Sequence, residues 1–260
     1  MSVFNEEIYR LCRQMRLSRN LAELALTTEA ETHQEFLIKL FTEELELRES
    51  RRYDTLIKAA GFYSVKTLKG FITDDIQFPV GAGLEQLASL DFIKNKFNIC
   101  MYGGTGTGKT MLSTALGVLA CKQGLTVKFY RTAALVNTLS EAKAAGTLSK
   151  TLSKIEKASA IILDEFGYVP VDRVGAQLLF EVISECSEKK SIILNTNLEF
   201  SSWVNILYDQ KMTAALISRL LHHCHLLIFN GPDMRLKESS INDMYAGLNP
   251  PTAVNSAGGG

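Results

Sequence analysis

The segment GGTGTGKT, at residues 103–110, constrains the fold of this chain more than any other. It follows the apolar run FNICMY and precedes MLSTALGVLACK, which has the composition of a buried helix. A Gly-x-x-x-x-Gly-Lys-Ser/Thr pattern between a strand and a helix is typical of a loop that binds phosphate groups. Its glycines let backbone N–H groups converge on an anion, and the N-terminus of the following helix adds partial positive charge. The segment predicts a nucleotide-binding α/β core.

Every residue of this loop is a candidate for nucleotide binding. Lys109 would neutralise the β- and γ-phosphates of ATP, and the hydroxyl of Thr110 would bind Mg²⁺. A glycine-rich turn that fits by chance is the alternative, and the flanking strand and helix argue against it. The expected cofactors are therefore ATP and Mg²⁺. The nucleotide-binding candidates are Gly103, Gly104, Thr105, Gly106, Thr107, Gly108, Lys109 and Thr110.

A second motif, AIILDE at residues 160–165, is an apolar run that ends in two carboxylates. Asp164 is placed to hold Mg²⁺ together with Thr110, and Glu165 is placed to polarise an attacking water. An acidic corner between a strand and a loop is the plainer interpretation of this pair. One further strand, LTVKFY, lies between the two motifs, and this order favours a hydrolase of the oligomeric-motor group over a small-molecule kinase.

Two more side chains complete the predicted hydrolysis site. The apolar run SIILNTN contains Asn195 and ends in Asn197, and an amide at the tip of a strand could hold the attacking water. Asn197 is the preferred candidate. Arg219 lies in the helical run AALISRLLHH and could reach the γ-phosphate of a neighbouring subunit as an arginine finger, a role that supplies about 10³ to 10⁵ in rate. An arginine that caps its helix or faces solvent is the alternative.

From about residue 70 the chain alternates between short apolar runs and helical patterns, as in βαβ units. The prediction is an α/β fold with a five-stranded parallel sheet between helices, over residues 70–245. Residues 246–260 have no periodicity and are predicted to form a disordered tail. The predicted strands are Phe97–Tyr102, Thr126–Tyr130, Ala160–Leu163, Ser191–Thr196 and Leu226–Phe229.

The sequence of residues 1–69 predicts a separate helical domain, and this domain is expected to bind DNA or a partner. The segment Thr28–Glu31 has the pattern of a capping box at the start of a helix, and Gly61 is a plausible end for it. The residues expected on the buried face of this helix are Phe36, Leu37, Leu40, Phe41 and Leu45.

Three longer segments join the phosphate loop in a wider pattern. They are DEFGYVPVDRVGAQLLFEVIS at 164–184, NTNLEFSSWVNIL at 195–207 and SRLLHHCHLLIFNG at 218–231. Together they resemble the IstB-type helper ATPases of bacterial insertion sequences, which belong to the initiator and loader group of AAA+ ATPases and are related to the DnaC-type helicase loader. The resemblance covers most of residues 50–240. It implies an AAA+ core and an ATP-dependent homo-oligomer, in a ring or helical assembly, that binds double-stranded DNA and recruits and stimulates the transposase of the same insertion sequence.

The resemblance also carries roles onto matching positions. Arg235, in GPDMRLKE, would contact the nucleotide as a second sensor. Two neighbouring positions depart from the family pattern, since Met234 replaces an aromatic residue and Ser218 replaces an aspartate. The other carried roles are Mg²⁺ binding by Thr110 and Asp164, and hydrolysis by Glu165, Asn197 and Arg219.

DNA binding would depend on local basic patches, because the chain has 28 basic and 28 acidic residues. One candidate patch is a row of arginines that recur every three residues, at Arg10, Arg13, Arg16 and Arg19, and that would form a slanting basic stripe on a helix. A second patch is preferred because it adjoins the ATPase core. A solvated helical face with internal ion pairs is the alternative for each patch. The preferred DNA-binding candidates are Arg48, Arg51, Arg52, Lys58, Lys66 and Lys69.

Other functions remain as alternatives. A helicase loader would share the core and use its N-terminal helices to grip a replicative helicase. A metabolite kinase would need an acceptor-binding domain that the sequence does not reveal, and Glu165 disfavours a scaffold that does not hydrolyse ATP. No stretch approaches the roughly 20 apolar residues that span a bilayer, and the N-terminus lacks a signal-peptide pattern, so a cytoplasmic protein with no membrane partner is expected. The 5 cysteines are expected to be reduced.

Overall fold

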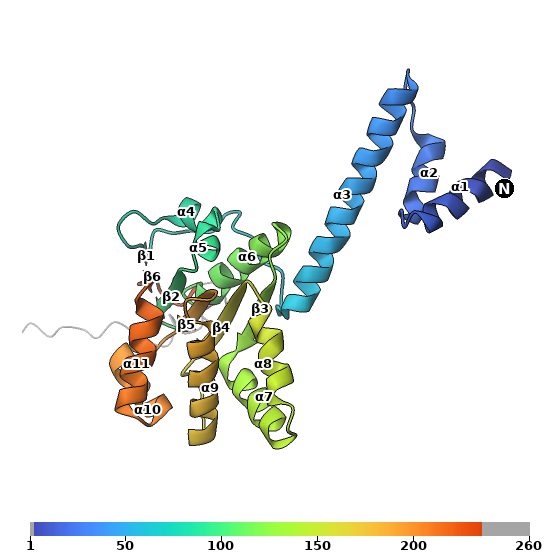
Figure 1. Ribbon diagram of the computed structural model, residues 1–260. Helices are drawn as coiled ribbons and strands as arrows, with labels where there is room; N and C mark the ends of the chain where they lie inside the picture. The colour runs from blue at the N-terminus through green and yellow to red at the C-terminus, as the bar shows by residue number, and fades with distance from the viewer. Residues whose placement is uncertain (1–2, 236–260) are drawn as a thin grey trace, which may run out of the picture.

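A mixed sheet flanked by helices forms the core of the computed structural model, which describes residues 3–235 (Figure 1). The predicted tail at residues 246–260 lies outside the described residues. The strand order in the sheet is β1-β6-β2-β5-β4-β3. The strands are β1 (Ile76–Gln77), β2 (Asn98–Gly103), β3 (Val127–Arg131), β4 (Ala160–Phe166), β5 (Ser191–Thr196) and β6 (Cys224–Phe229).

The sheet confirms the predicted α/β class and adds one strand to it. Strands β2 to β6 are paired in parallel throughout, and they correspond to the predicted five. The sixth, β1, lies antiparallel to β6, with Ile76 opposite Phe229 and Gln77 opposite Ile228. The predicted count was wrong because a strand of 2 residues is too short to leave a periodic pattern in the sequence.

Helices cover both faces of the parallel sheet. Ile162 of β4 packs with Leu112 and Leu116 of α6 (Lys109–Lys122) on one face, whereas its neighbour Ile161 packs with Leu179 of α9 (Arg173–Cys186) on the other. Successive strand residues point to opposite faces, so burial on both faces explains why these strands are continuous apolar runs. The core helices are α4 (Leu84–Ala88), α5 (Asp91–Lys94), α6 (Lys109–Lys122), α7 (Thr132–Ala144), α8 (Leu148–Glu156), α9 (Arg173–Cys186), α10 (Val204–Leu207) and α11 (Gln210–Leu221), with a 3-10 turn η1 (Phe200–Trp203).

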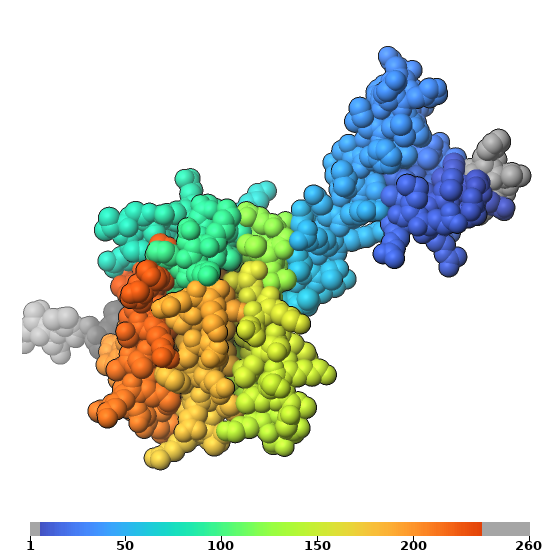
Figure 2. All heavy atoms as spheres, viewed as in Figure 1, coloured from blue at the N-terminus to red at the C-terminus, as the bar shows by residue number. Residues whose placement is uncertain are grey.

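The N-terminal residues form a helical module that projects from the core (Figures 1 and 2). Its helices are α1 (Val3–Gln14), α2 (Arg19–Thr27) and α3 (His33–Ala60). A small apolar cluster around Cys12, Leu21 and Leu40 joins them. The last turn of α3 joins the core through Ala60, and Gly61 ends the helix with a φ of 84°, as predicted. No helix within residues 3–235 is both long and apolar enough to cross a membrane.

Three predictions about this module were wrong. Thr28 ends α2 instead of starting a helix, because its hydroxyl donates to the carbonyl of Leu24, and the side chain that caps α3 is that of Thr32, which accepts from the N–H of Glu35. The predicted buried face is mostly open: Leu37, Phe41 and Leu45 are 47%, 50% and 61% exposed. The third error is the arginine row. Its members do not share one helix, since α1 ends at Gln14, Arg16 has a φ of 55° and Arg19 begins α2.

The cysteine residues carry free thiols, as expected: Cys12, Cys100, Cys121, Cys186 and Cys224. Burial raises the pKa of Cys121 to about 11 and that of Cys186 to about 11. A thiol with so high a pKa is almost entirely protonated at neutral pH and is a poor nucleophile. These side chains therefore act as small apolar groups in the core.

Candidate nucleotide site

The phosphate loop joins the end of β2 to the start of α6. Three of its glycines have a positive φ, of 151° at Gly103, 72° at Gly106 and 100° at Gly108. A Cβ atom at Gly103 would lie 2.3 Å from the carbonyl oxygen of Phe229 in the neighbouring strand. Glycine is the residue that tolerates both this backbone conformation and this close approach. The path of the loop therefore depends on the glycine spacing that the motif requires.

Lys109 is buried beneath the loop. Its ammonium group donates to the carbonyl of Gly103 at 2.7 Å and also to that of Gly104. Burial is the main cause that lowers the pKa of Lys109 to about 8, and the carboxylate of Asp164 opposes this shift. A triphosphate beside the ammonium group would favour its charged form. The lysine is thus poised to exchange two carbonyl partners for phosphate oxygens.

Thr110 and Asp164 meet between the loop and β4. The hydroxyl of Thr110 lies 3.0 and 3.1 Å from the two carboxylate oxygens of Asp164, which is almost fully buried. Thr132, at the start of α7, donates to the backbone carbonyl of Asp164 at 2.8 Å and holds this end of β4. Hydroxyl and carboxylate oxygens are the hard ligands that Mg²⁺ prefers. The side chains at these two positions therefore fit the metal that the sequence predicts.

The two asparagines of β5 and the turn after it have different surroundings. Asn195 is buried, and its amide donates to Asp164 and to Ser113, at 2.8 Å each. Its side-chain oxygen has no hydrogen-bond partner among residues 3–235. Asn197 is half-buried just beyond the end of β5. Asn195 thus orients the predicted metal ligand, whereas Asn197 is the asparagine at the strand tip.

Glu165 occupies an irregular position in β4. The pairing with β5 shifts register between Leu163 and Phe166, and Glu165 has a φ of 56°. A positive φ is uncommon for residues other than glycine and recurs at functional sites. The bulge turns Glu165 outward while Asp164 stays buried, so adjacent carboxylates face different surroundings.

Arg131, at the end of β3, lies beside this glutamate. Its guanidinium is 3.5 Å from the carboxylate of Glu165, and both side chains are about half exposed. The same guanidinium lies 4.3 Å from the ring centroid of Tyr63, in the segment that follows α3. Arg131 was not among the residues predicted from the sequence. The signal was present, because Arg131 follows the strand LTVKFY directly and the carboxyl ends of parallel strands meet at one edge of a sheet.

The segment after β6 crosses the phosphate loop. The N–H of Met234 donates to the carbonyl of Gly106 at 3.0 Å, and the carboxylate of Asp233 fills the space where a Cβ of Gly106 would lie. The charge of Arg235 contributes, after burial, to the lowered pKa of Lys109, so its guanidinium lies near the phosphate-binding position. Phe71 covers Gly108 from another side, with ring atoms 3.6 and 3.7 Å from a Cβ placed there. Neither Asp233, two residues before the predicted Arg235, nor Phe71 was among the residues predicted from the sequence.

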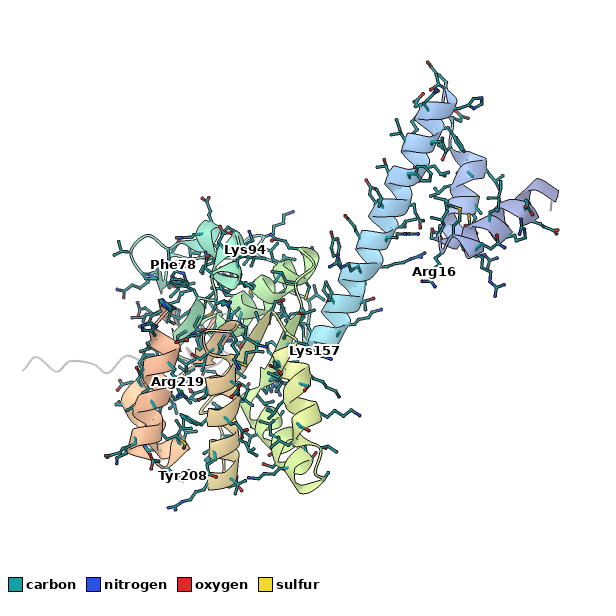
Figure 3. All side chains as sticks on the ribbon, in the orientation of Figure 1. Arg16, Phe78, Lys94, Lys157, Tyr208 and Arg219 are labelled. Carbon is teal, nitrogen blue, oxygen red and sulfur yellow. The ribbon has the colours of Figure 1, made fainter. Side chains whose placement is uncertain are left out.

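Arg219, labelled on α11 in Figure 3, lies near the amino-terminal end of β2, away from the phosphate loop. The carbonyl of its neighbour Leu220 accepts from the side chain of Asn98, the first residue of β2, whereas the phosphate loop follows the last residue of this strand. Five steps of about 3.3 Å separate the two ends, or roughly 16 Å. Arg219 therefore cannot reach the phosphates bound by its own subunit. The structure does not bring this residue together with the other predicted catalytic residues.

The predicted DNA-binding residues differ in how freely their charges are exposed. Arg48 forms an ion pair with Glu44 at 2.7 Å and donates to the carbonyl of Arg16, so it joins α3 to the rest of the module. Arg52 lies against Gly124 of the core, with its guanidinium 3.5 Å from the carbonyl oxygen. The other four candidates have exposed side chains, on α3 and in the segment after it: Arg51, Lys58, Lys66 and Lys69.

Comparisons with known proteins show which family the sequence matches. A family model described as "IstB-like ATP binding protein" matches residues 10–242. The ATP-binding protein of insertion sequence IS21 from Pseudomonas aeruginosa is 36% identical over 209 residues, which are 79% of this chain and 78% of the relative. That of insertion sequence IS5376 from Geobacillus stearothermophilus is 33% identical over 244 residues, 92% of this chain and 97% of the relative.

Solved structures support the fold. AMPPCP-bound DnaA from Aquifex aeolicus superposes with a TM-score of 0.51 at 19% sequence identity, over 70% of this chain and 58% of that chain. A DNA replication initiation factor gives the same TM-score at 21% identity and is covered over 54% of its length. At this level of identity the likeness concerns the arrangement of strands and helices. This chain thus spans a little over half the length of these solved structures.

Proposed function

This chain belongs to the IstB-like ATP-binding proteins of insertion sequences, and from this premise we propose that it is an ATPase that assembles on double-stranded DNA and stimulates its cognate transposase. The observation that carries the proposal is the contact of Thr110 and Asp164 beside the buried Lys109. A hydroxyl, a carboxylate and a lysine so arranged suit the binding of a nucleotide with its divalent metal. The adjoining carboxylate of Glu165 adds the means to hydrolyse it.

Nucleotide binding would use the loop and its surroundings. The N–H groups of residues 103–110 and the N-terminus of α6 would hold the phosphates, and Lys109 would neutralise part of their charge. Arg235 is our candidate for a further contact from the segment that crosses the loop. Thr110 and Asp164 would hold Mg²⁺, which when bound draws negative charge away from the phosphate oxygens.

Hydrolysis would then proceed by in-line attack. Glu165 accepts a hydrogen bond from a water molecule and takes its proton as the water oxygen bonds to the γ-phosphorus. The bond from the γ-phosphorus to the bridging oxygen breaks, and ADP and phosphate leave. Asn197 is our candidate for holding the water, while Asn195 fixes the orientation of Asp164. Separation of Glu165 from Arg131 would leave both carboxylate oxygens free to accept from the water.

Completion of the site would need a second subunit. Arg219 lies at the edge of the sheet away from its own phosphate loop, as described above, and it is exposed. In a ring or helical assembly, head-to-tail packing places one face of each subunit against a different face of the next. Arg219 would then reach the γ-phosphate bound by its neighbour and stabilise the charge of the transition state.

DNA contact would come from the basic side of α3 and the segment after it. Arg51 and Lys58 are exposed there, and a helix can place such cations along a row of phosphates. We propose the transposase as the protein partner because the chain belongs to this family and because the names of its relatives refer to insertion sequences.

A direct test measures particle mass and ATP turnover, with and without duplex DNA. We expect assembly on DNA that requires ATP, turnover that DNA stimulates, and ATP-dependent capture of the transposase encoded by the same element. A monomer under all conditions would contradict the role of Arg219. Capture of a replicative helicase in place of the transposase would instead support a helicase loader.

A further inference from the structure

A shallow hollow opens beside Arg219 at the edge of the sheet away from the phosphate loop. Lys96, Ser187 and Glu188 line it together with His222 and His223. Two of the lining side chains, Lys96 and Arg219, carry a permanent positive charge at neutral pH, and Glu188 is the one carboxylate among the described residues that line it. The hollow therefore presents more positive than negative charge to whatever lies against this edge.

Arg219 is held in place at the hollow. Its guanidinium donates to the hydroxyl of Ser184 and lies 5.5 Å from the ring centroid of Phe180, both on α9. A hydroxyl is a neutral partner and leaves the charge of the guanidinium uncompensated. Contacts of this kind fix an arginine without neutralising it, as a group that must stabilise an anion requires.

Lys96 reaches the same hollow from a different element. It follows the short helix α5, and its φ of 58° turns the chain so that β2 can begin at Asn98. Its side chain is exposed and forms no ion pair within the described residues. Lys94, 2 residues earlier, provides a contrast, because its ammonium group lies 2.9 Å from the carboxylate of Asp91. Figure 3 labels Lys94 on α5 and Arg219 on α11.

Cations that share a hollow repel each other, and a multivalent anion removes this repulsion. The terminal phosphate group of ATP carries enough negative charge to balance the charges of both Lys96 and Arg219. The phosphate loop of the same subunit cannot supply it, because roughly 16 Å of β2 separates the two edges. The loop of a second copy can supply it if the subunits pack head to tail.

We propose that Lys96 is a second cation that acts in trans, contacting the triphosphate bound by the neighbouring subunit beside Arg219. The proposal rests on the proposed function, since it needs ATP hydrolysis between subunits. It assigns to one hollow a pair of side chains from two elements, the turn after α5 and helix α11. Lys96 contributes a mobile charge on a long side chain, and Arg219 contributes a fixed one.

Mixing of inactive variants tests this assignment. Lys96→Ala alone is expected to lower DNA-stimulated ATP turnover by about 10- to 100-fold, as loss of a charge contact in the transition state does. Lys109→Ala disables the phosphate loop but keeps Lys96. In a 1:1 mixture of the two variants, about a quarter of the interfaces combine an intact loop with an intact Lys96 from the neighbour, so turnover returns toward that fraction of the wild-type rate.

Controls separate this proposal from the function on which it rests. Lys94→Ala removes a nearby charge that is already paired, and we expect wild-type turnover from it. Binding of a non-hydrolysable ATP analogue to dilute, unassembled Lys96→Ala should match the wild type, and its thermal unfolding should be unchanged. A parallel mixture of Arg219→Ala with Lys109→Ala tests the arginine finger alone.

The outcomes are distinct. Recovery of turnover in both mixtures supports the proposal. The role of Lys96 is overturned if Lys96→Ala turns ATP over at the wild-type rate, or if mixing it with Lys109→Ala does not restore the lost turnover. In either case, recovery in the mixture of Arg219→Ala with Lys109→Ala leaves the proposed function standing. Failure of the wild-type protein to hydrolyse ATP under any condition overturns the proposed function itself.

Discussion

The carboxylate of Glu165 lies 3.5 Å from the guanidinium of Arg131, which ends the neighbouring strand β3. Both side chains are about half exposed, and an exposed pair of this kind stabilises a protein by about 0 to 1 kcal/mol. The contact is thus too weak to matter for stability. It is strong enough to bias where Glu165 points, and Glu165 is the proposed base.

Arg131→Ala should therefore raise ATP turnover measured without DNA. Loss of up to about 1 kcal/mol of bias increases the population of unpaired Glu165 by up to about fivefold, and turnover should rise in proportion. The free energy of unfolding should fall by no more than about 1 kcal/mol, the most that an exposed pair of this kind contributes. Arg131→Lys keeps the charge and should stay closer to the wild type. A fall in turnover for Arg131→Ala would show that the arginine orients Glu165 for catalysis instead.

Glu165→Gln should bind ATP and assemble on DNA but fail to turn ATP over. A positioned general base contributes about 10² to 10⁴ in rate, and turnover should fall by that factor. Because glutamine is nearly the same size and the site is exposed, the fold should be retained. Sedimentation with labelled ATP would show nucleotide held in the DNA-bound particle. Turnover within about twofold of the wild type would remove Glu165 from the mechanism.

Nucleotide binding should take up protons at mildly alkaline pH. The pKa of Lys109 is lowered to about 8 from its ordinary value of 10.5, mainly by burial. A bound triphosphate raises it again, so the complex holds more protons than the free protein and affinity falls as pH rises above about 8. Calorimetry of analogue binding at pH 8.5, in buffers of different ionisation enthalpy, measures this uptake. Lys109→Arg should show none, because an arginine stays charged.

Stability should show the opposite trend from the same residue. Between pH 8 and pH 10.5 the unfolded chain binds the proton that folded Lys109 has released. The contribution of Lys109 to the free energy of unfolding therefore increases as pH rises through this interval. The difference in unfolding free energy between the wild type and Lys109→Met, followed by urea titration over this range, isolates the contribution.

Alanine substitutions of the two asparagines near the end of β5 should differ in their effect on the free energy of unfolding. Asn195 is buried and donates to Asp164 and Ser113, so Asn195→Ala should lower the free energy of unfolding by about 1 to 3 kcal/mol. Asn197→Ala should leave stability within about 0.5 kcal/mol and lower turnover if that amide holds the water. Urea denaturation and steady-state ATP turnover on both variants measure the contrast. Unchanged turnover of Asn197→Ala would exclude its amide as the group that holds the water.

Arg51 and Arg48 form a matched pair for DNA binding. Arg51 is exposed, whereas the guanidinium of Arg48 is engaged by Glu44. Arg51→Ala should weaken duplex binding and reduce the salt slope of log affinity by about 1, as loss of one phosphate contact does. Arg48→Ala should instead lower the thermal stability of the N-terminal module, since Glu44 is buried and would lose a partner. Equal salt slopes for Arg51→Ala and the wild type would exclude Arg51 from the interface.

The parts of the site that follow from sequence are those carried by continuous segments. A loop between a strand and a helix, and carboxylates at the end of a strand, have positions that local geometry determines, which is why Thr110 and Asp164 could be expected to lie close together, as their 3.0 Å contact shows. Their roles in binding Mg²⁺ stay predictions. Arg131 and Phe71 come from separate elements, and only the folded sheet brings them to the loop.

The module at the N-terminus was harder to predict for a different reason. Apolar residues at helical spacing do not reveal which face of α3 packs against α1 and α2, and Leu40 proved to be on that face while Leu37 and Phe41 are exposed. Similarly, Thr28 and Thr32 each precede a glutamate by three residues. Only the end of α2 at Thr27 decides which threonine caps α3.

Helix α3 has 28 residues and is anchored to the core at its last turn. At about 1.5 Å per residue it is a rod of about 42 Å, and a tilt of about 10° at its base moves its far end by about 7 Å, roughly two base-pair steps of duplex DNA. Tyr63, close beyond that base, touches Arg131, which in turn contacts Glu165. The length of α3 therefore gives leverage: a small tilt at its base, near the contact of Tyr63 with Arg131, becomes a displacement of several ångströms at its far end.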